Sequence, residues 1–249
     1  MTEILSAQAV RLALREQSDA GDAIHLQRFF KTGDGEYAAG DVFLGVRVPA
    51  TRKIAKAFAA LPLPEVADLL DGPVHEERLA ALFILNAQYA AAAKPRTRDE
   101  DKQRAIVELY LDAVRRGRVD NWDLVDSSAE HILGPWLADR PRDLLFELAA
   151  RESLWERRVA VLSTFAFIKS GDPSTTLALA DRLLPDRRDL IQKAVGWMLR
   201  EIGKRVDRTV LTDYLDSRAP RMGRTALSYA TEHLTPEERA NYRAMPRQE

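Results

Sequence analysis

Glycine and proline residues in this 249-residue chain lie mainly between blocks of apolar periodicity. The breaks fall at 72–73, 94–95, 171–173, 185 and 218–220. Between them, apolar residues recur every three or four positions, as in an amphipathic helix, and no alternating strand pattern competes. We therefore predict an all-α chain, with helices near 3–17, 21–32, 49–60, 64–71, 75–92, 99–117, 121–138, 141–150, 154–169, 173–184, 187–205, 207–216 and 220–232.

The predicted helices recur in pairs about every 35 to 45 residues, which is the period of HEAT-like repeats. Each pair in such an array buries its apolar face on its neighbours, so that stacked pairs build a curved α-solenoid. We expect residues 1–249 to form a single domain of this kind. Its concave surface would suit a long, regular ligand such as a duplex or an extended peptide.

Composition excludes several function classes. Hydrophobic residues make up 46% of the chain and charged residues 30%, a balance that allows a buried core and argues against disorder. No stretch approaches the roughly 18 to 20 consecutive apolar residues of a membrane span, and the first residues lack the basic start of a signal peptide. There is no cysteine, and the four histidines show no metal-ligand spacing. We expect a soluble, monomeric, cytoplasmic protein that needs no membrane, metal or other cofactor.

The net charge of -1 gives no reason to expect a polyanionic partner, so the positions of the charges matter more than their sum. Residues 42–60 carry four basic side chains and no acidic one. Residues 187–208 carry seven basic side chains against three acidic ones. These two stretches predict a polarised surface.

The predicted helix 187–205 sorts its side chains onto two opposed faces. One face carries Ile191, Val195, Met198 and Ile202. The other carries Lys193, Trp197, Arg200 and Lys204. An indole within a basic stripe suits a nucleic acid, with the ring as a stacking surface and the cations as phosphate contacts. The alternative is that Trp197 packs against the next repeat.

The predicted helix 121–138 brings an indole close to a carboxylate. Trp122 and Asp126 are four residues apart and therefore share one face. Asn121 is the expected N-cap, and Asp123 is a first-turn acid that favours the helix dipole. Asp126 lies beyond that effect, which leaves a catalytic role or a salt bridge to a neighbouring helix as its alternatives.

Two further segments hold cations at helix starts. Ser153 and Glu156 form a capping-box pattern, and Arg158 follows at the edge of an apolar face, either as a packed surface arginine or as a cation held for phosphate or Asp126. Trp155 is expected to pack. The segment 45–53 enters a helix through a proline and supplies Arg47, Arg52 and Lys53, which would attract phosphate. The glycine-rich segment 33–37 lacks the ending of a P-loop and follows no strand, so we exclude nucleotide binding there.

These motifs resemble those of the AlkD-type DNA alkylation-repair glycosylases, which are built from HEAT-like repeats. Trp-Asp-Leu-Val-Asp at 122–126 is similar to the family's Trp-Asp-x-Val-Asp motif, and Trp-Glu-Arg-Arg at 155–158 to its Trp-x-x-Arg motif. Residues 191–201 resemble its most distinctive helix, and 45–53 its Gly-x-x-x-Pro-x-x-Arg segment. The motifs keep the family's order over about residues 20–233. The tail from 234 adds nothing recognisable, and Asn121 stands where some relatives have an aromatic residue.

The resemblance implies a catalytic set of Trp122, Asp126, Arg158 and Trp197, which would have to converge from separate repeats. It implies a monofunctional enzyme that excises N3- or N7-alkylated purines from duplex DNA by hydrolysis and leaves an abasic site. The expected partner is double-stranded DNA containing alkylated purines, with backbone contacts from Arg47, Arg52, Lys53, Lys193, Arg200 and Lys204. The alternatives are a non-catalytic binder of damaged or branched DNA and a protein-interaction scaffold.

Overall fold

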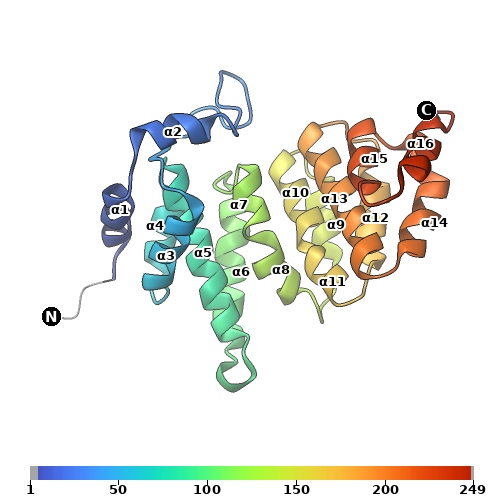
Figure 1. Ribbon diagram of the computed structural model, residues 1–249. Coiled ribbons are helices and arrows are strands. Elements are labelled where there is room, and N and C mark those ends of the chain that lie inside the picture. The colour runs from blue at the N-terminus through green and yellow to red at the C-terminus, as the bar shows by residue number, and fades with distance from the viewer. Residues whose placement is uncertain (1–4, 248–249) are drawn as a thin grey trace. The chain divides into compact units, whose positions relative to one another are not determined.

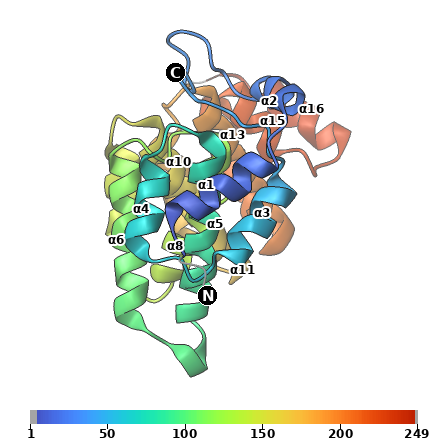
Figure 2. The same cartoon turned by 90° about the vertical axis from the view of Figure 1, so that its left-hand side faces the viewer.

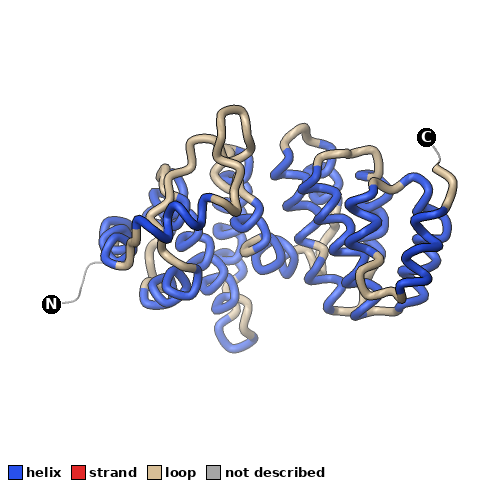
Figure 3. Tube along the Cα trace, turned by 45° about the horizontal axis from the view of Figure 1, so that its top comes forward, coloured by secondary structure: helices blue, strands red, loops and turns tan. Residues whose placement is uncertain are grey.

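The computed structural model describes residues 5–247, and within that range the chain is helical with no β-strand (Figures 1 and 3). The only pairing of extended backbone there is an isolated parallel bridge between Val42 and Val74. The prediction of an all-α protein is confirmed. The helices are α1 Ala7–Glu16, α2 Ala20–Gln27, α3 Val48–Ala57, α4 Leu63–Asp71, α5 His75–Ala92, α6 Glu100–Arg115, α7 Trp122–Asp126, α8 Ala129–Trp136, α9 Asp143–Ala150, α10 Leu154–Ser163, α11 Phe165–Lys169, α12 Ser174–Leu183, α13 Asp189–Arg205, α14 Arg208–Arg218, α15 Arg224–Ala230 and α16 Pro236–Ala244, with 3-10 turns η1 Pro95–Thr97 and η2 Ala219–Arg221.

The chain divides into two compact units, here called unit 1, which ends at Ile132, and unit 2, which begins at Leu133. The boundary falls inside α8. The expectation of one domain over 1–249 stays a prediction.

Unit 1 is built around α5, which packs against α3, α4 and α6 (Figure 2). Its core is apolar and fully enclosed, with Val66, Leu82, Ile84 and Ile106 at 0% exposure. Polar side chains fix the helix starts, as where Asp99 accepts a hydrogen bond from the backbone N–H of Lys102 at 2.9 Å. A long loop, residues 28–47, joins α2 to α3 and is visible in Figure 3.

Unit 2 is built around α13, which packs against α10, α14 and α15. The predicted apolar face of this helix is buried, with Ile191, Met198 and Ile202 at 0% exposure. Gly196 lets α15 approach closely, because a Cβ atom there would lie 2.4 Å from the backbone oxygen of Ala226. The glycine next to Trp197 therefore has a packing role.

Two predicted helices are interrupted by hydroxyl side chains. The segment 121–138 divides into α7 and α8, and Ser128 Oγ donates to the carbonyl of Leu124 at 2.6 Å near the break. The segment 154–169 divides at Thr164, whose Oγ1 donates to the carbonyl of Val161 at 2.6 Å. Such local side-chain bonds offer the backbone an alternative to the helical ladder.

The tail from 234, where the sequence predicted no helix, contains one. It forms α16, which begins with a capping box made by Thr235 and Glu238. Across residues 5–247, no helix combines the length and the apolar character needed to cross a membrane.

Candidate DNA-interaction and active-site residues

Trp122 and Asp126 are the first and last residues of α7 in unit 1, and both are half-buried. The indole stacks on Phe30, with ring centroids 5.4 Å apart and planes 22° apart, and its Nε1 donates to the carbonyl of Phe29 at 3.3 Å. Burial and the charge of Asp126 both raise the pKa of the buried Tyr110 phenol. The predicted indole and carboxylate thus sit on one short helix in an aromatic setting.

A buried histidine, which the sequence analysis did not identify as a site residue, bonds to this helix. His75, the first residue of α5, is 2% exposed. Its Nε2 is 2.8 Å from Oδ2 of Asp123, and its Nδ1 is 3.2 Å from Oδ2 of Asp41. Burial disfavours the charged imidazole, but the bonds to the two carboxylates outweigh it and raise the pKa of His75 to about 9. The imidazole is therefore a cation at neutral pH, clamped between two carboxylates.

Arg78, one turn further along α5, extends this network. It is 3% exposed and pairs with Asp41 and, at 2.5 Å, with Asp120. Asn121, the N-cap of α7 as predicted, donates from Nδ2 to Asp41 at 3.0 Å. Burial raises the pKa of Asp41, but its bond to His75 and the charge of Arg78 prevail, so the pKa lies below its usual value. The network ties the start of α7 to α5 and to the loop that carries Phe30.

The same aromatic rings surround the histidine and the indole. Phe30 and Phe43 contact the imidazole with centroids 5.0 and 4.7 Å away, and Phe30 also stacks on Trp122. The signal in the sequence is the run of four ionisable residues at 75–78, all of which are buried although they open an apolar helix. Such residues are rarely buried unless paired.

The segment that leads into α3 is held by a carboxylate from α5. Glu76, 2% exposed, accepts hydrogen bonds from the backbone N–H groups of Leu44, Gly45 and Val46 at 2.8 to 3.2 Å. These three amides are thus already bound and do not face a phosphate, so the predicted attraction of this segment for phosphate rests on its cations. Gly45 has φ +83°, and a Cβ atom there would lie 2.0 Å from the carbonyl oxygen of Asp19.

The predicted backbone-contact cations of unit 1 differ in their surroundings. Arg47 is exposed but pairs with Asp22 through two bonds of 2.6 and 2.7 Å. Arg52 lies over the ring of Phe83, 4.0 Å from its centroid, and Lys53 is exposed. Arg52 and Lys53 are both exposed to solvent. A phosphate that binds Arg47 would have to compete with Asp22.

In unit 2, Trp197 is half-buried beside a buried carboxylate. Its indole is tilted against Phe165 with centroids 5.9 Å apart, and its Nε1 donates to Oε1 of Glu201 at 3.3 Å. Glu201 is 4% exposed and also pairs with Arg200 at 3.3 Å and Arg205 at 2.6 Å. Burial raises the pKa of Glu201, but the two arginines lower it below its usual value. Within the predicted stripe, Trp197 and Arg200 therefore share one buried carboxylate as a partner.

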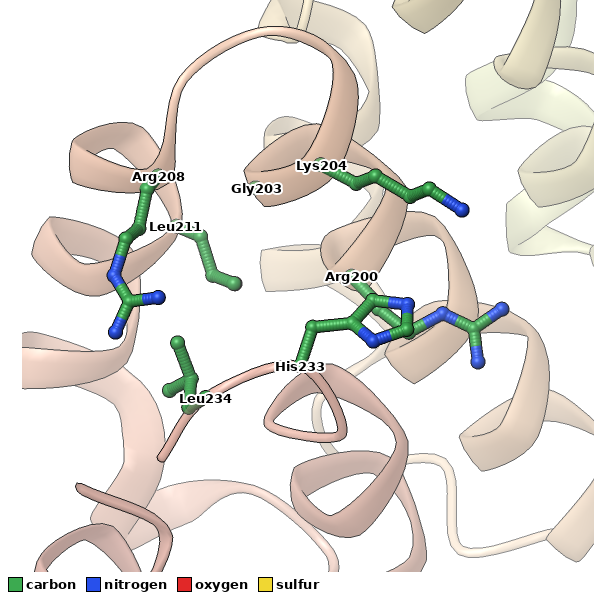
Figure 4. A pocket seen from close by; sticks show the side chains of 7 residues that line it. All are labelled: Arg200, Gly203, Lys204, Arg208, Leu211, His233 and Leu234. Carbon is green, nitrogen blue, oxygen red and sulfur yellow. The ribbon is translucent and has the colours of Figure 1, made fainter. Parts of the chain in front are cut away.

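The other predicted cations of α13 lie along the same helix. Lys193 pairs with Asp189 at 2.8 Å, and Arg200 pairs with Glu232 in addition to Glu201. Lys204 is exposed and, with Arg200, lines a pocket of about 170 Å³ (Figure 4). Figure 4 shows its two leucines, Leu211 and Leu234, among the basic side chains.

Arg158 is buried at 4% exposure, and its Nη1 donates to the carbonyl of Leu190 at 2.5 Å. It therefore supports the first turn of α13, the helix that bears Trp197. Ser153 begins α10 as predicted, accepting from the backbone N–H of Glu156 at 3.4 Å, and Trp155 is buried as expected. The expected convergence of Arg158 and Trp197 with Trp122 and Asp126 stays a prediction.

Over residues 5–247, no group of three or more His, Asp or Glu side chains is arranged to hold a metal ion. What the fold and the two clusters define is an all-helical protein in which tryptophans stand beside carboxylates and arginines.

The sequence profile of the family described as DNA alkylation repair enzyme matches residues 10–234. The chain belongs to this family, and the resemblance noted in the sequence is confirmed. A solved structure of a predicted DNA alkylation repair enzyme from Enterococcus faecalis is similar to 88% of this chain, over 98% of its own length, with a TM-score of 0.63 and 16% identity. At that identity the likeness shows the fold. No curated protein matches the chain.

Proposed function

We propose that this member of the DNA alkylation repair family is a monofunctional DNA glycosylase. It would hydrolyse the N-glycosidic bond of N3- or N7-alkylated purines in duplex DNA and leave an abasic site. The observation that carries the proposal is the half-buried Asp126 on the same helix as Trp122, whose indole is fixed by Phe30 and by the carbonyl of Phe29. Family membership supports a role in the repair of alkylated DNA.

Asp126 would stabilise the sugar as the bond breaks. An alkylated purine carries a positive charge and leaves readily, so that oxocarbenium character on the deoxyribose becomes the main cost of the transition state. A nearby carboxylate lowers that cost in the way glycosidase carboxylates do, and it can also orient the attacking water. Because Asp126 is half-buried, solvent screens its charge less than it would on an exposed surface.

Trp122 and Trp197 would contact the cationic base and the sugar through their π faces. Each such contact contributes about 0.5 to 2 kcal/mol, depending on desolvation, and favours cationic over neutral bases. The bonds from the two indole N–H groups, to Phe29 and to Glu201, orient the rings before DNA binds. Arg158 would hold the lesion-side phosphate, which requires its guanidinium to turn from its position against α13.

The contacts with the DNA backbone would come from cations at the start of α3 and along α13, namely Arg47, Arg52, Lys53, Lys193, Arg200 and Lys204. Such contacts position a duplex without reading its sequence. A lyase step would need a desolvated lysine nucleophile, and within residues 5–247 no lysine is buried. The proposed product is therefore an intact abasic strand.

The test is release of free base from duplexes that contain N7-methylguanine or N3-methyladenine. We expect release by the wild type and a loss of about 100- to 1000-fold in Asp126→Asn, with duplex binding retained. Asp101→Asn, which changes an exposed first-turn carboxylate of α6, is the control and should release base normally. Salt-dependent binding without release by any variant would instead identify a non-catalytic binder of damaged DNA, and absence of duplex binding would reject both.

A further inference from the structure

Four arginines of unit 2 gather around one pocket without a carboxylate partner. Many arginines of the protein form ion pairs, such as Arg157 with Asp186 at 2.8 Å and Arg218 with Asp181 at 3.1 Å. Other arginines form no ion pair with a carboxylate within residues 5–247, and four of these line the same pocket: Arg187, Arg221, Arg224 and Arg247. All four are exposed, and all four line one pocket of about 370 Å³.

The pocket is shaped by the turn between α14 and α15. Pro220, Met222 and Gly223 complete its lining. Arg247 is anchored to this turn, because its Nη1 donates to the carbonyl of Met222 at 2.6 Å. Arg187 approaches from the start of α13, with its Nη1 3.5 Å from the carbonyl oxygen of Arg221. Carbonyl groups thus hold two of the guanidinium groups in place without neutralising their charge.

The carboxylates on this flank are already engaged. Asp186, next to Arg187 in the chain, pairs with Arg157 and Arg188, and Asp181 pairs with Arg218. Arg224 is the first residue of α15, where a cation opposes the helix dipole and lowers stability. Four like charges gathered in one hollow, one of them at an unfavourable helix position, repel one another until an anion binds.

We propose that this pocket, lined by Arg187, Arg221, Arg224 and Arg247, is a phosphate-binding site that takes a backbone phosphate of duplex DNA. Arginine is suited to this ligand because its planar fork donates two parallel hydrogen bonds to phosphate oxygens. The assignment of duplex DNA as the source of the phosphate rests on the proposed function. None of these four residues belongs to the family motifs or to the predicted cation set, so the site adds a contact beyond them.

The distance between the pocket and Trp197 determines where along the duplex the phosphate contact would lie. Trp197 lies eight residues after Asp189, the first residue of α13, which at 1.5 Å per residue corresponds to about 12 Å, or between three and four base-pair steps of about 3.4 Å, and Arg187 precedes that first residue. The pocket is therefore a remote anchor and not part of the catalytic group. Its removal should weaken binding without changing the chemical step.

The first experiment tests the pocket without DNA. Pyrophosphate at about 100 times its Kd should raise the Tm of the full-length wild type by roughly 5 to 10 °C. The double variant Arg221→Gln/Arg224→Gln should lose this rise, whereas Arg151→Gln/Arg243→Gln, which removes two exposed arginines of unit 2 outside the pocket, should keep it. An equal rise in Tm with pyrophosphate in the two variants would overturn the proposed site.

The second experiment distinguishes DNA from free phosphate as the ligand. The dependence of log K on log salt concentration for duplex binding should become shallower by about 1 to 2 in Arg221→Gln/Arg224→Gln and stay unchanged in the control. Base release at saturating duplex should equal that of the wild type. Pyrophosphate binding with an unchanged salt slope would overturn the DNA assignment. A wild type that binds DNA but releases no base would reject the glycosylase proposal alone, because the salt slopes still test the pocket.

Discussion

The Nε2 atom of His75 lies 2.8 Å from Oδ2 of Asp123, and this bond joins the first turn of α5 to the first turn of α7. Asp123 and Asp126 are only three residues apart, but they have different partners. Asp123 holds a buried imidazolium, while Asp126 ends the helix and its charge raises the pKa of Tyr110. The sequence predicted a first-turn role for Asp123, and the structure adds a structural bond that helps to fix the helix bearing Trp122.

Exchanging each aspartate for asparagine should therefore separate stability from activity. Asp123→Asn removes the charge that faces a buried cation and should lower the free energy of unfolding by about 1 to 3 kcal/mol. Asp126→Asn should reduce base release by about 100- to 1000-fold and lower the free energy of unfolding by less than Asp123→Asn does. Urea unfolding and base release, measured on both variants, check this pair. Equal losses of stability would contradict the division of roles.

Because the pKa of His75 is raised in the folded protein, its contribution to the free energy of unfolding is lost as the pH becomes alkaline. The pKa rises from 6.5 to about 9 on folding, so its contribution is complete below about pH 6.5 and is lost as the pH rises through about 9. The amount is on the order of 3 kcal/mol. The difference in unfolding free energy between the wild type and His75→Gln should therefore shrink between pH 6 and pH 9.5, because other groups titrate equally in both. A constant difference over that range would show that the imidazole does not carry this charge.

Gly45 and Gly35 offer a matched pair for the segment that leads into α3. Both have positive φ, +83° and +76°, but only Gly45 lacks room for a side chain, with Asp19 and Ala23 backbone atoms 2.0 and 2.6 Å from a built Cβ. Gly35→Ala should cost about 1 kcal/mol from backbone strain alone. Gly45→Ala should cost at least about 3 kcal/mol, because the chain has to move as well. Urea unfolding of the two variants tests the difference, and equal costs would contradict the close approach.

Helix type and position were predictable because they depend on local patterns. The proline-containing breaks at 72–73 and 94–95 follow the ends of α4 and α5, and apolar spacing placed the buried face of α13. The interruptions at Ser128 and Thr164 were not predictable in this way. A hydroxyl in a helical pattern either points to solvent or bonds back to its own turn, and only the packing around it decides.

The clusters around the tryptophans were less predictable. Spacing on one helix was enough to pair Trp122 with Asp126. His75, however, bonds to Asp41, which lies 34 positions before it, and to Asp123, which lies 48 positions after it. No pattern on a single helix contains that information. The same holds for Glu76, which reaches back 30 to 32 residues to the amides before α3. A run of buried ionisable residues at a helix start indicates that partners exist, but not which ones.

Trp197 should determine the preference for a charged lesion. Its ring is half-buried and is oriented by Glu201, so replacing it by alanine removes a π face without removing a core residue. In an Asp126→Asn background, which prevents cleavage, Trp197→Ala should reduce the preference for an N7-methylguanine duplex over an unmodified one by about 2- to 30-fold, the equivalent of 0.5 to 2 kcal/mol. Trp155→Phe, at a buried packing position, should lower stability and leave the preference unchanged. Equilibrium binding of both duplexes to each variant measures the ratio. If Trp197→Ala weakened binding to both duplexes equally, the indole would contact the DNA without sensing the charge of the base.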